Sequence, residues 1–485
     1  VFMGKIGYNM KFKLFIILIA LFIASCKEKI QENNSINGVW QSVGSGWMLH
    51  IEDSSSYSLF DVTSISCLPR RKAELREILE SLALKDDTLS YLKGVITYKF
   101  TKAEGLPKLC GTELKEETQK DPIYNFEVFS ETVKDHYAFM ELNSVNWPKL
   151  FQQQKDKLSK HSTDLELYSV IEETLEKLND NHAYLEANDE VYEALEQKHL
   201  DQEEEARDDE NLREFGDFTI AKMVAKHHLE EEMTKDSWLI QWGKLKEKVG
   251  YIQIKAMWLY ADLDVPDSLI EELGYVDAYV KTLQKLYEGD YIEKEVEGVK
   301  KTMDKIMDDL ADMNSIIIDL RFNGGGQDAV SFEILRRFVT QKQKIATQKL
   351  KYGNQFSPTL PLYINGTTKA YSKPVYLLTS QQTGSAAEAF AIATMSMKNI
   401  KRIGSPTSGA MSTALEKILP NGWAFSISNE VYMDVQGNGY ENKGIPVDYD
   451  LRYPYDRQTF FRAVANDLEA DKQSILKAMD ILRAE

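Results

Sequence analysis

The chain has 485 residues, which corresponds to about three domains of ordinary size. Hydrophobic residues make up 43% and charged residues 28%, and these proportions exclude a wholly disordered, collagen-like or multi-span membrane chain. The net charge of −18 argues against a broad nucleic-acid-binding surface, because the protein would repel phosphate backbones. Three cysteines exclude a disulfide-scaffold protein and a cysteine-rich zinc protein.

An apolar block near the N-terminus indicates export. Residues 14–24 read LFIILIALFIA and are too few to span a bilayer, which needs about 20 apolar residues. The pattern predicts a signal peptide over residues 1–25. Small residues lead directly into Cys26, which resembles the lipobox of bacterial lipoproteins and implies acylation on Cys26. We therefore expect a lipid-anchored protein of the bacterial cell envelope; the alternative is a plain secretory signal with an incidental cysteine.

A polar tether, residues 26–36, is expected to precede a small, separate β-rich domain over residues 37–120. The stretches VWQSV, WMLHIE, YSLFDVTS and GVITYKF are rich in β-branched and aromatic residues and lie between turn-forming residues. The segment KAELREILESL, residues 72–82, predicts a short helix between them. Cys67 and Cys110 are either a disulfide or two buried thiols.

In the middle of the chain the spacing of apolar residues changes from that of strands to that of helices. Residues 121–185 carry apolar side chains at helical spacing and predict a helical subdomain. Residues 186–248 are strongly acidic and are expected to be a helical insertion with a solvated face, and not a PDZ-like β-domain. A calcium site is the alternative for the acidic run, although it lacks the spacing of an EF-hand.

Residues 249–460 alternate short apolar strands with helices, which predicts an α/β core. VGYIQI, SIIIDL, PVYLLT and IKRIG are the expected strands, and residues 277–312, 328–339 and 386–398 the expected helices. Such alternation is typical of a mostly parallel sheet that is covered on both faces. A C-terminal helix is expected over residues 461–485.

Two glycine-containing turns in this core could carry chemistry. SIIIDLRFNGGG runs from a strand into Asn323 and three glycines, whose N–H groups could face an oxyanion; the alternative is a tight turn. In PVYLLTSQQTGSAAEAF, Ser385 opens a helix among small residues that leave its hydroxyl accessible. Ser385 is either a nucleophile or an ordinary N-cap.

Two further segments could supply a base and a carboxylate. His182 follows a helix in LEKLNDNHAYL, and histidine is the usual base for a serine nucleophile, whereas an exposed loop histidine is the plainer interpretation. Glu441 precedes a glycine-containing turn in GYENKGIPVDYDL. It could orient an imidazole, or it could be ordinary surface charge.

Taken in order, these segments resemble the carboxyl-terminal processing (tail-specific) serine peptidases. That family includes the tricorn core protease and the interphotoreceptor retinoid-binding repeats. The resemblance covers roughly residues 123–455 and is strongest over DLRFNGGG, LLTSQQTGSAAEAF, GSPTSG, LPNG and ENKGIPVD. It implies a crotonase-like catalytic core, a superhelix of ββα units, and a serine endopeptidase that acts on peptides or unfolded proteins of the cell envelope. It implies no metal and no organic cofactor.

The resemblance also assigns roles. The nucleophile would be Ser385, the base His182 and the orienting carboxylate Glu441, as in the tricorn branch. The lysine of the other branch is absent, because Ala410 stands at its position. The oxyanion hole would be formed by N–H groups of Gly324, Gly325 and Ala386, with Asn323 and Asn181 in support.

Two departures from the family pattern keep an alternative open. Asn181 stands where the tricorn branch has a serine, and proline and valine are exchanged in the turn after Glu441. The chain could therefore be a catalytically inactive binding protein on the same fold, for an apolar ligand or a peptide. A structural lipoprotein that binds a partner through its β-domain is the third hypothesis.

Overall fold

The computed structural model describes residues 35–203, 216–235, 237–286 and 291–484. The expected signal peptide, Cys26 and residues 27–34 of the tether lie outside the described residues. Within the described part, no helix is long and apolar enough to cross a bilayer. Residues from Gly38 onward form one compact unit, which is described below.

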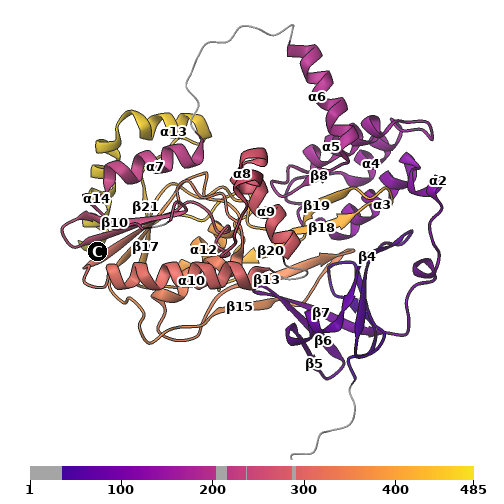
Figure 1. Cartoon of the computed structure of the whole chain (residues 1–485), viewed down its shortest axis with the longest axis horizontal. Coiled ribbons are helices and arrows are strands. Elements are labelled where there is room, and N and C mark those ends of the chain that lie inside the picture. Colours follow the sequence, from indigo (N-terminus) through magenta and orange to yellow (C-terminus); the bar gives the residue numbers. More distant parts are fainter. Residues whose placement is uncertain (1–34, 204–215, 236, 287–290, 485) are drawn as a thin grey trace, which may run out of the picture. The chain divides into compact units, whose positions relative to one another are not determined.

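The N-terminal β-rich region is a seven-stranded antiparallel sheet in the order β4-β3-β2-β1-β7-β6-β5. Figure 1 draws it in indigo and labels β4, β5, β6 and β7. Its apolar side chains, among them Leu49, Leu89 and Phe100, are buried against each other and the rest of the unit. Cys67 and Cys110 form a disulfide. The strands are β1 (Gly38–Ser42), β2 (Trp47–Ile51), β3 (Ser56–Val62), β4 (Cys67–Glu74), β5 (Leu82–Lys85), β6 (Thr88–Lys93) and β7 (Ile96–Ala103).

The helix expected over residues 72–82 is not formed. Residues 72–74 end strand β4, where they pair with Ser56, Tyr57 and Ser58 of β3. Two short 3₁₀ turns follow, η1 (Leu75–Glu77) and η2 (Leu79–Ser81). Strand pairing and the burial of Leu75 and Ile78 outweigh the helical propensity of so short a segment.

The three longer helices of the helical subdomain begin at side-chain caps. Asp121 caps α3 and is followed by Pro122 at the first position, and Thr163 with Glu166 forms a capping box on α5. Helix α5 ends at Asn179, which adopts the left-handed conformation. The helices are η3 (Lys108–Gly111), α2 (Glu116–Gln119), α3 (Pro122–His136), α4 (Trp147–Lys155) and α5 (Asp164–Leu178).

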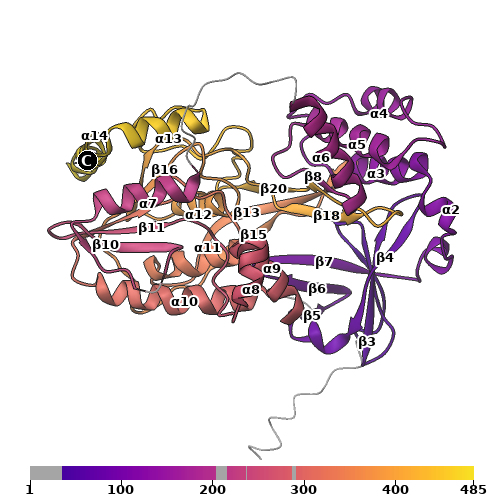
Figure 2. The same ribbon diagram turned by 45° about the horizontal axis from the view of Figure 1, so that its top comes forward.

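The acidic stretch is largely helical where it is described. Helices α6 (Asp189–Glu203) and α7 (Asp217–His228) lie on either side of residues 204–215, and α7 packs against the C-terminal helices (Figure 2). Strands β9 (Glu231–Glu232) and β10 (Ile240–Lys246) then enter the central sheet. The described residues of this stretch thus form helices and sheet-edge strands.

The central sheet has the order β21-β17-β16-β12-β11-β10-β9, and β11, β12, β16, β17 and β21 run parallel. Alternate residues face opposite sides: Ile316 and Ile318 pack against helices α10–α12, whereas Ile317 packs against α14. The predicted parallel α/β sheet, covered on both faces, is therefore confirmed. Its strands are β11 (Val249–Ile254), β12 (Ser315–Asp319), β16 (Val375–Thr379), β17 (Ile400–Gly404) and β21 (Tyr449–Asp450).

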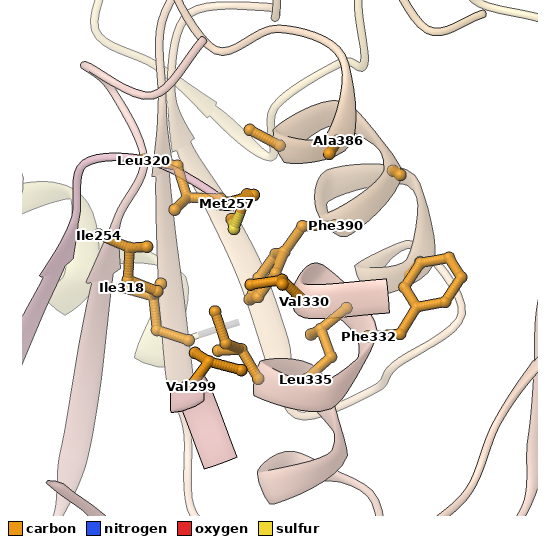
Figure 3. Close-up of a cluster of buried hydrophobic side chains, with 14 of the residues drawn as sticks. Ile254, Met257, Val299, Ile318, Leu320, Val330, Phe332, Leu335, Ala386 and Phe390 are labelled. Carbon is orange, nitrogen blue, oxygen red and sulfur yellow. The ribbon is translucent and has the colours of Figure 1, made fainter. Parts of the chain in front are cut away.

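The larger core lies between this sheet and three helices. Figure 3 shows Ile254, Ile318 and Leu320 on one side and Val330, Leu335 and Phe390 on the other. Ala386, at the start of α12, borders the same cluster, so the position of α12 is fixed by packing. The helices of this region are α8 (Asp267–Leu273), α9 (Tyr275–Leu286), α10 (Ile292–Asp309), α11 (Asp328–Leu335), η4 (Arg336–Phe338), α12 (Ala386–Thr394), α13 (Arg457–Asn466) and α14 (Leu468–Ala484).

Two small sheets complete the unit. One joins β13 (Gln343–Tyr352), β14 (Gln355–Phe356), β15 (Leu360–Ile364) and β20 (Glu430–Met433). The other joins β18 (Ala414–Ile418), β19 (Ala424–Ser428) and β8 (Tyr184–Glu186). The second sheet matters for function, because β8 directly follows His182 and pairs with a strand that lies more than 200 residues later in the chain.

Candidate active site

Ser385 stands at a sharp turn between strand β16 and helix α12. Its φ is 52° and its ψ is −122°, a backbone conformation that a residue with a Cβ adopts rarely. Such strain persists only where the surroundings enforce it, and it gathers at functional sites. The Ser385 N–H donates to the carbonyl of Ala410 at 3.0 Å, which fixes the turn against the 407–410 loop.

His182 lies in a loop that the small β18-β19-β8 sheet holds in place. Asp180 accepts the N–H of His182 at 2.9 Å and also accepts the hydroxyl and the N–H of Ser428 in β19, at 2.6 and 2.7 Å. The hydroxyl of Ser426 donates to the His182 carbonyl. Strand β19 therefore determines where the imidazole lies.

The structure brings Ser385 and His182 together. Oγ of Ser385 lies 3.1 Å from Nε2 of His182, although the residues are 203 positions apart in the chain. Both side chains line a cavity of about 360 Å³. A serine hydroxyl in contact with a neutral imidazole, open to a cavity, is the arrangement that proton transfer from a nucleophile requires.

The imidazole is held in its neutral form. Burial lowers the pKa of His182 below its ordinary value, and the nearby Asp180 carboxylate partly offsets this by raising it. Nδ1 of His182 is buried, and within the described residues no hydrogen-bond partner of it is found. The uncharged imidazole is therefore the favoured form at neutral pH, and Asp180 is its acidic neighbour.

The hydrogen bond of Glu441 differs from the expected one to His182. Its carboxylate accepts the N–H of Met411 at 3.0 Å, and in the described part of the chain no hydrogen bond joins it to the imidazole. Burial, aided by the charges of Glu388 and Asp180, raises the pKa of Glu441 to about 8. This carboxyl is engaged by the backbone of the loop after Ala410, and its predicted orienting role stays a prediction.

The glycine loop also differs in detail from the expectation. The N–H of Gly325 donates to Oδ1 of Asn323 at 2.9 Å, so it is engaged within the loop. Asn323 in turn donates to the carbonyl of Ile254 at 3.0 Å, which makes it a support of the loop as predicted from its place in the motif. Gly326 lines the cavity with Ser385.

The remaining predicted residues lie in different surroundings. Ala386 is buried at the first position of α12, where an N–H has no partner inside the helix. Gly324 is exposed. The side chain of Asn181 is exposed as well, and no hydrogen bond found among the described residues joins it to Ser385 or His182.

Glu388 is a functional residue that sequence reasoning missed. It is fully buried, one turn into α12, and accepts from Thr407 Oγ1 at 2.6 Å, Ser408 Oγ at 2.9 Å, and the N–H groups of Gly409 and Ala410 at 2.8 and 2.7 Å. It also accepts the N–H of Ser385 at 3.3 Å. This one carboxylate therefore joins the nucleophile turn to the neighbouring loop; its position three residues after Ser385 was the available clue.

A buried ion-pair network lies behind the glycine loop. Arg321 is fully buried and donates to Asp319 at 2.7 Å, to Asp471 of α14 at 2.9 Å and to the hydroxyl of Tyr453 at 2.8 Å. Such a group is stable only because every donor has a partner. The network ties the end of β12, where the loop begins, to the C-terminal helix.

Comparisons with known proteins identify a family domain in the core of the chain. Residues 248–451 match the model of peptidase family S41, a range that contains Ser385 and Glu441 but not His182. Among solved structures, a candidate peptidase from Parabacteroides merdae is similar at 17% identity and a TM-score of 0.50, over 73% of this chain and 99% of that one. At this identity the similarity concerns the fold.

Two further structures are similar over comparable lengths. Mature CPAF matches at 11% identity and a TM-score of 0.49, over 75% of this chain and 98% of its own. The photosystem II D1 C-terminal processing protease matches at 12% and 0.40, over 73% and 99%. Residues 248–451 are therefore a domain of peptidase family S41, and the chain that contains them is a serine-type peptidase that hydrolyses peptide bonds.

Proposed function

We propose that the protein is a serine endopeptidase in which Ser385 is the nucleophile and His182 the general base, and that it acts on peptides or unfolded proteins in the cell envelope. The observation that carries the proposal is the 3.1 Å contact between Ser385 Oγ and His182 Nε2 at the wall of a cavity. The strained backbone of Ser385 supports it, since an ordinary N-cap does not need a positive φ.

The reaction follows from this pair. Ser385 Oγ attacks the scissile carbonyl carbon while its proton passes to Nε2 of His182, and the imidazolium then protonates the leaving amine. A water molecule, deprotonated by the same imidazole, hydrolyses the acyl-enzyme and restores Ser385. We assign the oxyanion hole to the N–H of Ala386 and to an N–H of the glycine loop, with Gly326 favoured because it lines the cavity.

Asp180 is the favoured acidic partner of the imidazolium. Its charge acts on His182 directly, and it also positions the His182 backbone. Glu441, the family's expected partner, is the second possibility. The two are separated by comparing Asp180→Asn with Glu441→Gln: the residue that supports the imidazolium lowers kcat when neutralised, whereas the other variant retains wild-type kcat.

Covalent labelling tests the proposal. The full chain without its signal peptide is treated with a fluorophosphonate, and intact mass is measured for wild type, Ser385→Ala and His182→Ala. We expect one label on wild type, none on Ser385→Ala and a labelling rate reduced by about 10²–10⁴ in His182→Ala. A folded wild type that takes up no label would contradict the proposal and favour a binding protein.

The cellular location is part of the same proposal. The apolar residues 14–24 followed by Ser25 and Cys26 support export and a lipid anchor on Cys26. In bacteria fed an alkyne-labelled fatty acid, the protein should acquire the label and sediment with membranes. Cys26→Ser should remove both properties, and retention of the label in that variant would exclude this site of acylation.

A further inference from the structure

The N-terminal sheet forms part of the wall of the catalytic cavity. Lys93, Val95 and Tyr98, around and after the turn between β6 and β7, line the cavity that contains Ser385 and His182. The turn itself is tight, since Lys93 pairs with Ile96 and Gly94 has a φ of +60°. A domain with no part in catalysis would not be expected to reach the nucleophile's cavity.

The sheet is fixed relative to this cavity. Nζ of Lys417 in β18, a residue only 3% exposed, lies 2.7 Å from the carboxylate of Asp61 in β3 and 2.7 Å from the carbonyl of Ser45. Arg70 of β4 donates to the Asp61 carboxylate at 3.2 Å and to the carbonyl of Glu416 at 2.7 Å. These contacts, of which those of Lys417 are buried, dock the sheet onto β18, a strand that itself lines the cavity.

A second cavity, of about 460 Å³, borders the first at the tip of the β6–β7 hairpin. The two share four lining residues, which are Gly94, Val95, Ile292 and Ala329. A Cβ built on Gly94 would lie 3.2 Å from Ile292 and 3.9 Å from Ala329, so the tip contacts the beginnings of α10 and α11. The cavities are therefore neighbours around a single structural element.

The lining of the second cavity indicates what it would hold. Apolar side chains come from the hairpin, α10, α11 and β15, namely Leu92, Val95, Ile292, Val296, Phe332 and Ile364. Four charged residues also line it: Arg336 is paired with Glu333 at 3.5 Å, and Glu293 and Glu297 leave the lining with a net negative charge, which disfavours an acidic group. A cavity of this size and polarity suits an apolar side chain.

We propose that the two cavities form one substrate groove, in which the β6–β7 hairpin binds an apolar side chain of an extended polypeptide away from the scissile bond. The inference rests on the proposed function: a polypeptide is the expected ligand of the second cavity because that cavity adjoins the one that contains Ser385. It gives the N-terminal sheet a role: Leu92 of the hairpin and Tyr363 of the facing strand β15 are specificity-determining residues. Both are about half exposed, at 47% and 49%, so substituting them does not disturb a core.

The test measures the binding of a polypeptide to a variant that lacks the Ser385 hydroxyl, so that the result does not depend on catalysis. In the full chain carrying Ser385→Ala, fluorescence anisotropy follows the binding of reduced, carboxamidomethylated, fluorescein-labelled α-lactalbumin, an unfolded polypeptide. Leu92→Asp and Tyr363→Ala are added singly, with Leu109→Asp as the matched control. Leu109 is 43% exposed, lies in the same N-terminal region and lines neither cavity.

We expect Leu92→Asp and Tyr363→Ala each to weaken binding by about ten-fold, and Leu109→Asp to leave it unchanged. In the active protein, fluorophosphonate labelling of Ser385 should be the same in all three variants, because that probe is too small to reach the second cavity. Binding equal to the control in both groove variants would overturn the inference even if wild type is labelled. Weakened binding without labelling of wild type would retain the groove and refute the peptidase proposal.

Discussion

Gly325 offers a direct test of how the glycine loop shapes the nucleophile. Its φ is +115°, and a Cβ built on it would lie 2.6 Å from Cβ of Ser385 and 3.0 Å from the nitrogen of Ala386. Ordinary contacts begin at 3.4 Å, so in Gly325→Ala the loop or the Ser385 turn must move by about 0.8 Å. Displacements near 1 Å at a reacting group cost about 10²-fold in rate. We therefore expect Gly325→Ala to slow the labelling of Ser385 by about two orders of magnitude.

The neighbouring glycine supplies the control. A Cβ built on Gly324 meets no atom within 4 Å, and its φ lies outside the left-handed region. Gly324→Ala should therefore label at close to the wild-type rate. The assay is the second-order rate constant for a fluorophosphonate, with circular dichroism and thermal melting to show that both variants are folded. Equal rates for the two variants would refute the claim that the loop presses on Ser385.

Three further predictions concern the groups around the site. The labelling rate should rise with pH as His182 loses its proton, and its midpoint should lie below the ordinary 6.5 because burial lowers the pKa of His182. Asp180→Asn should lower the midpoint further, because the Asp180 carboxylate raises this pKa. A higher midpoint in Asp180→Asn would contradict this assignment. Glu388→Gln should lower the free energy of unfolding by about 2–4 kcal/mol, because the N–H₂ of the new side chain would face the backbone N–H donors of Gly409 and Ala410. The control is Glu116→Gln, at a side chain that is 77% exposed, which should leave the melting temperature unchanged. Replacing Cys67 and Cys110 by serine removes a disulfide with a sequence separation of 43 and should lower the free energy of unfolding, measured with denaturant, by about 2–4 kcal/mol. Wild type unfolded in the presence of a reductant should show the same stability as this variant.

The central sheet could be predicted from the sequence because its strands are short, apolar and bounded by helices. SIIIDL and PVYLLT became β12 and β16, buried on both faces. The stretch after Cys67 could not be predicted, because its helical spacing competes with strand pairing to Ser56–Ser58. That pairing is a tertiary interaction, and it cannot be predicted from the local propensity of the segment.

The site was predicted unevenly, for a related reason. Motif order and family resemblance pointed to Ser385 and His182, which the structure places in contact. The partners of Glu441 and Gly325 depend on the exact conformation of their loops: Glu441 accepts from Met411, and Gly325 donates to Asn323. Glu388 was missed because its partners are mostly backbone N–H groups and hydroxyls of a loop about 20 residues away, which carry no signature in the sequence.

The anchoring of the His182 loop on β19 has a consequence for the newly made chain. Ser426 and Ser428, which hold Asp180 and His182, come almost at the end of the sequence, and Asp471 of α14 secures the glycine loop later still. Because synthesis starts at the N-terminus, His182 is made long before Ser426 and Ser428, the residues that position its loop. The contacts that position His182 and the glycine loop therefore cannot form until nearly all of the chain has been synthesised and folded.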